Sequence, residues 1–238
     1  MSPGQRQLVL PLAHRPLLGR ADFLVSPSNK VAFDAVTGPY TAALALTGPA
    51  GAGKTHLASV WGEKHRAVLV MAADLKAQMV GAMGDVAAVV IEDADRLRAL
   101  PEAARADAET ALFHAINLCR AEDTALLVTG REAPGHWVLD LPDLRSRIEA
   151  MNHVAIAPPD DVLLSSILDK LFGDRQISAT PELTRYLVVR MERSFAAAER
   201  IVDHLDRTAL SAGRAVNRSL AAEIFASEPG IIAGTGDP

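Results

Sequence analysis

Cysteine, long apolar runs and an excess of positive charge are what this 238-residue sequence lacks. A single cysteine, Cys119, excludes a disulfide framework and any zinc module built on several cysteines. The longest apolar stretches, such as residues 86–91 and 124–129, are far shorter than the roughly 18 residues of a membrane-spanning helix. The formal net charge of −5 argues against a protein that coats nucleic acid through bulk charge.

Other missing patterns narrow the class further. The seven histidines show no metal-ligand spacing, which disfavours a metal enzyme. The N-terminal residues follow no signal-peptide pattern, so we expect a cytoplasmic protein. Hydrophobic residues make up 49% of the chain, enough for a core, which excludes a disordered chain. Cys119 falls in an apolar helical stretch and is interpreted as a buried structural thiol.

Apolar strands and helices alternate over residues 21–158. The strands do not alternate in polarity, which is typical of strands buried on both faces. Strands separated by helices predict a parallel α/β sheet with helices on both faces. A first helix is expected to begin near Ser28. The strands are expected at residues 40–47, 67–71, 86–91, 124–129 and 153–156, with helices between them at 54–64, 75–80 and 102–122.

The pattern changes at Pro158-Pro159, after which every expected element is helical. The spacing predicts helices at residues 161–172, 181–191, 195–211 and 216–225, forming a small all-helical lid domain. We therefore expect four regions. They are a proline-rich extended arm at 1–20, an α/β nucleotide-binding domain at 21–158, the lid at 159–227 and a flexible tail at 228–238.

Residues 48–55 read GPAGAGKT and fit the pattern G-x-x-x-x-G-K-[ST] between a strand and a helix. The glycines let backbone N–H groups turn inward around phosphate oxygens, beside the positive end of the following helix. The lysine supplies a point charge to the β and γ phosphates, and the threonine hydroxyl can bind Mg²⁺. The binding candidates in this loop are Gly48, Gly51, Ala52, Gly53, Lys54 and Thr55.

Two carboxylates, Glu92 and Asp93, directly follow the strand expected at 86–91. Beside a phosphate loop they can hold Mg²⁺ or its waters and orient an attacking water; alternatively they are capping or surface acids. Such sites usually begin with Asp, so Glu92 puts this chain's own ATP hydrolysis in doubt. Asp95 is interpreted as solvated. Thr129, at the end of the next strand, is a weaker candidate for a contact with the γ phosphate.

Arg145 and Arg147 follow the segment Leu141-Pro142-Asp143-Leu144. The spacing alone favours exposed side chains without a functional role for both arginines. An arginine in this place can also reach a nucleotide on a neighbouring subunit and stabilise transition-state charge in trans. The residues by themselves leave both interpretations open.

Together these motifs resemble the AAA+ superfamily and, within it, the bacterial replication initiator DnaA, over about residues 20–225. The phosphate loop continues into His56-Leu57, as in the initiator branch. Residues 23–30, FLVSPSNK, are similar to the segment that opens the initiator's nucleotide-binding domain. The resemblance implies that Val25 and His56 join the nucleotide site.

Two further segments carry the resemblance. Residues 144–147, LRSR, are similar to box VII, in which the last arginine is the finger; this implies a catalytic role for Arg147. Residues 191–193, MER, are similar to the sensor 2 region, which implies that Arg193 contacts nucleotide. Arg190 and Arg200 are nearby competitors for that role. Only 13 residues follow Phe225, too few for the initiator's helix-turn-helix domain.

The segment at residues 7–12, QLVLPL, resembles the sliding-clamp-binding motif Q-L-x-L-P-L. Its apolar side chains would enter a groove while the glutamine amide hydrogen-bonds at the rim, and the proline lowers the ordering cost. The partner-binding candidates are Gln7, Leu8, Leu10, Pro11 and Leu12. In front of an initiator-like core, the arm resembles that of the Hda-type regulators of DnaA.

The resemblance implies a regulator that binds ADP or ATP with Mg²⁺ and docks on the β subunit of the DNA polymerase III sliding clamp. It would stimulate ATP hydrolysis by DnaA through Arg147 and so prevent re-initiation of replication. Its own ATPase is expected to be weak or absent. No strong direct DNA binding and no membrane contact are expected. A homo-dimer or oligomer is possible, and the protein would associate with the nucleoid and replisome.

Two other functions remain open from the sequence. One is a clamp-tethered AAA+ adaptor that recruits a partner other than DnaA. The other is a self-sufficient ATPase motor that assembles into a homomeric ring. A small-molecule kinase is disfavoured, because kinases of that kind usually insert their lid within the α/β domain.

Overall fold

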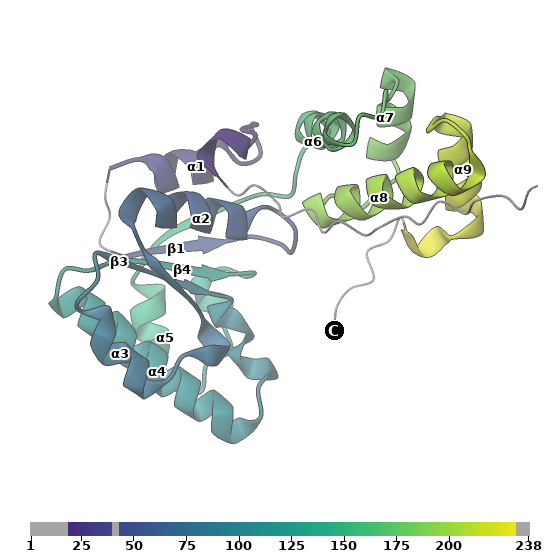
Figure 1. Cartoon of the computed structure of the whole chain (residues 1–238). Coiled ribbons are helices and arrows are strands. Elements are labelled where there is room, and N and C mark those ends of the chain that lie inside the picture. The colour runs from purple at the N-terminus through teal and green to yellow at the C-terminus, as the bar shows by residue number, and fades with distance from the viewer. Residues whose placement is uncertain (1–18, 40–42, 232–238) are drawn as a thin grey trace, which may run out of the picture.

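The sheet in the computed structural model has five strands, all parallel to their neighbours. The structure describes residues 19–39 and 43–231 (Figure 1). The strand order is β2-β3-β4-β1-β5, which confirms the predicted α/β fold. The strands are β1 (Ala43–Thr47), β2 (Val68–Met71), β3 (Ala88–Glu92), β4 (Ala125–Gly130) and β5 (Asn152–Ala155).

The burial of the strands explains why their sequences are apolar. Every residue of β3 and of β4 is buried, whereas the edge strands β2 and β5 each contain exposed residues. The register places Thr47 opposite Gly130 and Ile91 opposite Val128. Because the strands are parallel, the carboxyl ends of β1, β3 and β4 meet at one edge of the sheet.

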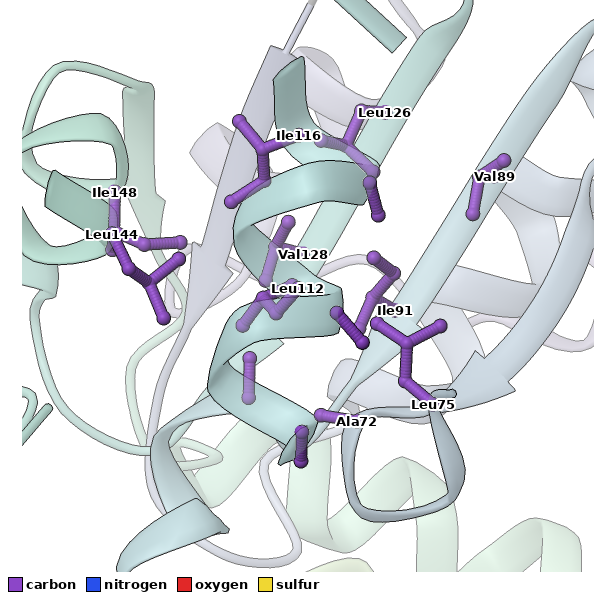
Figure 2. Close-up of a cluster of buried hydrophobic side chains, with 14 of the residues drawn as sticks. Ala72, Leu75, Val89, Ile91, Leu112, Ile116, Leu126, Val128, Leu144 and Ile148 are labelled. Carbon is purple, nitrogen blue, oxygen red and sulfur yellow. The ribbon is translucent and has the colours of Figure 1, made fainter. Parts of the chain in front are cut away.

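Helices cover both faces of the sheet (Figure 1). Helices α1 (Lys30–Thr37) and α2 (Lys54–His65) lie on one face. Helices α3 (Ala77–Val80), α4 (Glu102–Ala121) and α5 (Pro142–Glu149) lie on the other. Figure 2 shows side chains of α4 and α5 in this second cluster, packed with strand residues; the labelled ones include Leu112, Ile116, Leu126, Val128, Leu144 and Ile148.

A second group of helices follows the sheet: α6 (Asp161–Asp174), α7 (Pro181–Val188), α8 (Phe195–Ala212) and α9 (Arg218–Ser227). These helices have a hydrophobic cluster of their own, centred on residues such as Leu164, Leu187 and Leu205. Short 3₁₀ turns complete the described chain: η1 (Arg20–Asp22), η2 (Ala72–Asp74), η3 (Gly81–Met83), η4 (Ala94–Ala99), η5 (Pro134–His136) and η6 (Pro229–Ile231).

Several predicted element bounds were wrong at their ends. The helix expected at 181–191 ends at Val188, because the N–H groups of Arg190 and Met191 turn back to the carbonyl of Leu187. The helix expected at 216–225 begins at Arg218, after Asn217 caps it. The first helix begins at Lys30, and residues 40–42 of the first predicted strand lie outside the described ranges.

Direct bonds join the helical group to the α/β part. The N–H of Phe195 donates to the carbonyl of Gly51 over 3.0 Å. The N–H of Ser28 donates to Asp160 Oδ2 over 3.2 Å, and Lys170 Nζ lies 3.0 Å from Asp22 Oδ1. The start of α8 therefore touches the phosphate loop.

The structure bears on two predictions, one for Cys119 and one for membrane-spanning helices. Cys119 is 2% exposed, and burial raises the pKa of its thiol to about 11, which confirms a buried thiol. Within the described ranges, none of the helices combines the length and the apolar content needed to cross a bilayer.

Candidate functional site

The backbone of the loop between β1 and α2 has conformations that glycine adopts without strain. Gly51 and Gly53 have φ of 69° and 99°, in the left-handed region that L side chains rarely adopt. A Cβ on Gly51 would also lie 2.5 Å from the Cβ of Ser194, which leaves no room for a side chain. Ala52, between them, is buried. This curvature turns the loop around the N terminus of α2.

No side chain caps the N terminus of α2. The first N–H groups of a helix have no partner within the helix, so this end is a site for an anion. Lys54 is buried, and its Nζ donates to the carbonyls of Gly48 and Pro49 over 2.8 and 3.1 Å. Burial lowers the pKa of Lys54, the carboxylates of Asp93 and Asp95 oppose that change, and Arg131 adds to it.

The predicted acids lie at the carboxyl end of β3, next to this loop. Glu92 is 7% exposed, and its Oε1 has no hydrogen-bond partner among the described residues. Burial and the charge of Asp93 raise the pKa of Glu92, although a hydrogen bond with Thr55 and the charge of Lys54 act against the rise. The structure therefore brings Glu92, Thr55 and Lys54 together.

Thr129 is buried at the end of β4, where its Oγ1 accepts the N–H of Asp93 over 3.0 Å. Asp93 needs this support because its φ is 54°, an unusual value for a residue with a side chain. The pairing places both predicted residues at one edge of the sheet. The Thr129 hydroxyl hydrogen is still available to a ligand there.

Oxygen donors at this edge fit a magnesium ion better than a metal held by protein alone. Among the residues that the structure describes, no group of three or more His, Cys, Asp or Glu side chains could hold a metal. Mg²⁺ is usually bound by one or two carboxylates together with phosphate oxygens and waters. The exposed hydroxyl of Thr55 and the unpartnered Oε1 of Glu92 match that donor set.

The prediction that Asp95 is solvated was wrong. Asp95 Oδ2 accepts the N–H of Arg131 over 2.6 Å, and its Oδ1 is buried with no hydrogen-bond partner in the part of the chain that the structure describes. The sequence also gave no reason to select Arg131. The only signal was its position two residues after Thr129, the candidate at the end of β4.

The predicted residues on the N-terminal side lie against α2. His56 Nε2 is 3.0 Å from the carbonyl oxygen of Gly19, and the Phe23 ring meets the His56 ring edge-on at 5.1 Å. Phe23 packs into the sheet core, whereas Leu24 packs against the helical group. Val25, the next residue, is 48% exposed. This segment therefore bridges the two parts of the molecule beside the phosphate loop.

Arg193 directly precedes Ser194 and Phe195, which contact the loop, but its side chain is bound elsewhere. Its Nε donates to the carbonyl of Pro159 over 2.9 Å, and its Nη2 lies 2.6 Å from Asp161 Oδ1. The following residue, Ser194, is the one that meets Gly51. Of its competitors, Arg190 stacks on Tyr186 and Arg200 lies 3.7 Å from Glu192.

Arg145 and Arg147 on α5 are both exposed but differ in their contacts. Arg145 Nη2 donates to the carbonyl of Leu139 over 2.7 Å. Within the described part of the chain, the Arg147 side chain makes no hydrogen bond or ion pair. Arg147 is thus a cation on the surface that a partner can reach.

A buried acid that the sequence did not single out anchors the start of α5. Glu109 on α4 is 2% exposed, and its carboxylate accepts the N–H groups of Asp140 and Leu141 over 2.9 Å each. Its one signal was its place on the apolar face of a helix, beside Ala108 and Leu112. The predicted partner-binding residues Gln7, Leu8, Leu10, Pro11 and Leu12 lie outside the described residues.

No family model matches the chain, and no curated protein matches it by sequence. Solved structures do match. Domain III of the replication initiation protein DnaA from Thermotoga maritima matches with a TM-score of 0.75 and 18% identity, over 92% of this chain and 98% of that chain.

DnaA bound to AMPPCP and single-stranded DNA matches with a TM-score of 0.68 and 18% identity, over 81% of this chain. This chain spans 65% of that one, less than two thirds of its length. The Holliday junction branch migration motor RuvB of Thermotoga maritima matches with a TM-score of 0.66 and 16% identity, over 88% of this chain and 71% of that chain. The chain therefore has the same fold as DnaA domain III and RuvB, a parallel sheet followed by a group of helices.

Proposed function

We propose that this protein binds ATP or ADP with Mg²⁺ at the phosphate loop and acts as a regulator of replication initiation. One observation carries the nucleotide part: the buried ammonium of Lys54 lies inside a glycine loop at an uncapped helix N terminus. A buried cation beside unpartnered N–H groups favours an anion with several oxygens. The DnaA structure bound to AMPPCP has the same fold, which supports a nucleotide as that anion.

Each residue then has a role that follows from its place. Lys54 exchanges its bonds with the carbonyls of Gly48 and Pro49 for phosphate oxygens. Thr55 and Glu92 would hold Mg²⁺, which neutralises phosphate charge when bound. Asp93 and Thr129 lie where they can orient a water and the terminal phosphate. The other contacts proposed for nucleotide come from Val25, Gly48, Gly51, Ala52, Gly53, His56 and Arg193.

Weak hydrolysis by this chain itself forms part of the proposal. Such sites usually begin with Asp, whereas this chain has Glu92. The longer side chain changes the geometry relative to aspartate. We therefore assign the chain as an activator of another protein's ATPase.

The proposed target is ATP held by DnaA, reached by Arg147. Arg147 is exposed and makes no hydrogen bond or ion pair to residues 19–39 or 43–231, and it lies on a helix whose start is fixed by Glu109. We propose that the arm at 1–20 binds the polymerase III β clamp through residues 7–12. The domain at 21–158 and the lid at 159–227 would hold nucleotide, followed by a tail at 228–238. Such a protein would be cytoplasmic, near the replisome, and able to form a homo-dimer or oligomer.

The nucleotide site is tested by titrating the full chain with ADP and with ATP in the presence of Mg²⁺. Lys54→Ala should weaken binding of both nucleotides. Lys64→Ala is the matched control, because this lysine lies at the opposite end of α2, where it binds the carbonyls of Thr37 and Gly38. Equal affinities of the wild type and Lys54→Ala would refute the site.

The regulatory part is tested with DnaA preloaded with labelled ATP, together with ADP, clamp and clamp-loaded DNA. Arg147→Ala should abolish stimulation of hydrolysis, because removing an arginine that acts in trans typically lowers the rate about 10³- to 10⁵-fold. Arg145→Ala, two residues away and bound to Leu139, should retain it. Deletion of residues 1–13 should also abolish stimulation, as should omission of the clamp.

Other outcomes identify the alternatives. Clamp binding through the arm without any change in DnaA hydrolysis would favour an adaptor for another partner. Rapid hydrolysis by the isolated chain that rises with its own concentration would favour a self-assembling motor.

A further inference from the structure

A groove of about 610 Å³ runs between α6 and α7. Helix α7 lies between α6 and α9 and packs against both (Figure 1). The apolar lining of the groove consists of Phe172, Ile177, Ala179, Pro181, Val188 and Val189. Val189, directly after α7, is 71% exposed, so the apolar surface continues from the groove onto the outside of the helix. A continuous apolar surface of this kind is typical of a contact with another protein.

The charged side chains that line the groove differ between its two walls. Asp161 and Asp169 belong to α6, and each already has a partner. Asp161 Oδ1 lies 2.6 Å from Arg193 Nη2, and Asp169 Oδ1 accepts the hydroxyl of Thr184 over 3.1 Å. Arg185 on α7 is exposed, and no acceptor in the described part of the chain binds its guanidinium. The α7 wall therefore carries a positive charge that is free to bind an anion.

Most arginines of the helical group have a carboxylate partner. Those that lie against an Asp or Glu are Arg175, Arg193, Arg200, Arg207 and Arg214. Within the residues that the structure describes, Arg185, Arg190 and Arg218 have no such partner, and all three are exposed. The unpaired positive charge of this group is thus concentrated on α7 and at the start of α9.

Tyr186, which follows Arg185 in the chain, brings the other two guanidiniums together. The Cζ atoms of Arg190 and Arg218 lie 4.0 and 5.5 Å from the centroid of its ring. Phe225 stacks on the same ring, with 5.8 Å between the centroids. A guanidinium that already rests on a ring loses less freedom when it binds an anion. The two like charges also repel each other, and an anion bound by both offsets that repulsion.

We propose that the α6–α7 groove and these three arginines form one docking surface for an acidic, apolar segment of a partner protein. The apolar side chains of the segment enter the groove and cover Val189. Its carboxylates lie against Arg185, Arg190 and Arg218. Charge complementarity selects this occupant, because the free charges beside the apolar surface are all guanidiniums. The surface contains no residue of the phosphate loop, so this proposal is independent of the proposed nucleotide site.

A strand of nucleic acid fits the same surface less well. Single-stranded nucleic acid is held by a basic groove together with open aromatic faces on which its bases stack. The ring of Tyr186 is instead contacted by Phe225 and by two guanidiniums. Asp161 and Asp169 line the groove itself, where they repel phosphate groups. A protein segment avoids this repulsion when its acids are confined to the end that meets the arginines.

The experiment selects binders from a phage-displayed library of random short peptides, with the full chain as the target. We expect the enriched peptides to combine apolar residues with several Asp or Glu residues. Fluorescein-labelled synthetic copies of these peptides are then titrated with the chain, and fluorescence anisotropy gives their affinities. These affinities should fall as the salt concentration rises, because the charges involved are exposed.

Variants separate the two parts of the surface. A triple variant with Arg185→Ala, Arg190→Ala and Arg218→Ala should lower the peptide affinity by roughly tenfold or more. Val189→Ser changes an exposed side chain and should lower the affinity roughly threefold to tenfold. Arg207→Ala is the matched control, since this exposed arginine pairs with an acid of its own helix, and it should leave the affinity unchanged.

Several outcomes would overturn the proposal. They are a selection that enriches no peptide, enriched peptides without acids, and equal affinities of the wild type and the folded triple variant. Binding of a labelled oligothymidylate that the triple variant loses would assign the surface to nucleic acid instead. If circular dichroism showed the triple variant to be unfolded, Arg218→Ala alone would serve as the test, with an expected loss of roughly threefold in peptide affinity. No loss in Arg218→Ala would then reject the proposal.

Discussion

The helices α6 to α9, which we propose form the lid, and the helices around the sheet begin in different ways. Each of α6 to α9 has a side chain that caps its first turn: Asp160, Thr180, Ser194 and Asn217 accept the N–H three residues ahead. None of α1 to α5 has such a cap. The lid helices are therefore specified by their own sequence, and the sheet helices by what packs around them.

The absence of a side-chain cap has its clearest consequences at α2 and α5. At α2 the absent cap leaves the N–H groups to a ligand. At α5 the preceding backbone is held from a distance, by Glu109 on α4. The two helices that carry the proposed ligand and partner contacts, α2 and α5, thus begin without a side-chain cap of their own.

The difference between the two groups of helices is tested most directly by asking whether α6 to α9 unfold together with the sheet and its helices. Leu205→Ala removes a fully buried side chain of the lid cluster, which should cost about 2–5 kcal/mol. Both tryptophans, Trp61 and Trp137, lie outside that cluster. In urea, helix loss by far-UV circular dichroism should then precede the change in tryptophan fluorescence.

A control in the sheet completes this test. Leu127→Ala removes a fully buried residue of β4 at a similar cost and should shift the tryptophan transition. If Leu205→Ala moved both probes equally, the two parts would form one cooperative unit and the contrast would have no energetic meaning.

The anchor at α5 should give the next largest effect. Glu109→Ala leaves the N–H groups of Asp140 and Leu141 without their acceptor, and we expect a loss of about 2–3 kcal/mol in the free energy of unfolding. Chemical denaturation measures this. Asp107→Ala, exposed on the same helix, should change it by less than about 0.5 kcal/mol. Equal effects of the two variants would show that Glu109 anchors nothing.

Loss of a lid cap should cost less. Thr180→Ala removes the acceptor for the N–H of Leu183 and should cost about 1 kcal/mol. Thr180→Ser should restore most of the stability, and Ser178→Ala, exposed and outside the cap, should have no effect. Thermal unfolding followed by circular dichroism measures the differences, and a stability of Thr180→Ala equal to that of Ser178→Ala would contradict local specification of α7.

The smallest predicted effect is on the pH dependence of stability, through the carboxylate of Asp160. Partial burial acts to raise the pKa of Asp160, but hydrogen bonds from Leu163, Ser26 and Ser28 outweigh it and hold the pKa below its usual value. A lowered carboxyl pKa adds stability that is present above the unfolded-state pKa of about 3.9 and is lost as pH falls through the folded-state value.

Asp160→Asn keeps a capping oxygen but removes this titration. The stability of the variant should therefore vary less between pH 7 and pH 3 than that of the wild type, as measured by urea titrations across that range. An unchanged pH dependence would mean that protonation of Asp160 does not change the free energy of unfolding.

The parts that sequence could predict are those with local signals. Apolar runs located the strands, and the G-x-x-x-x-G-K-[ST] pattern located the loop and the place of Lys54. Glu109, Asp95 and Arg131 were missed or misjudged, because their roles depend on residues about 31 to 36 positions away in the chain. Arg193 was found by its motif, but its bonds to Pro159 and Asp161 follow from packing that no motif reports.

The freedom of Arg147 has a consequence for the lifetime of any complex that it forms. Its neighbour Arg145 already lies against the carbonyl of Leu139 and has little mobility left to lose. A free arginine side chain gives up about 1.5–2 kcal/mol of conformational entropy when it is held in one place. If Arg147 binds a partner's phosphate as proposed, part of the attraction between them is therefore cancelled on contact. This favours repeated brief encounters, so that one molecule can serve many partners in turn.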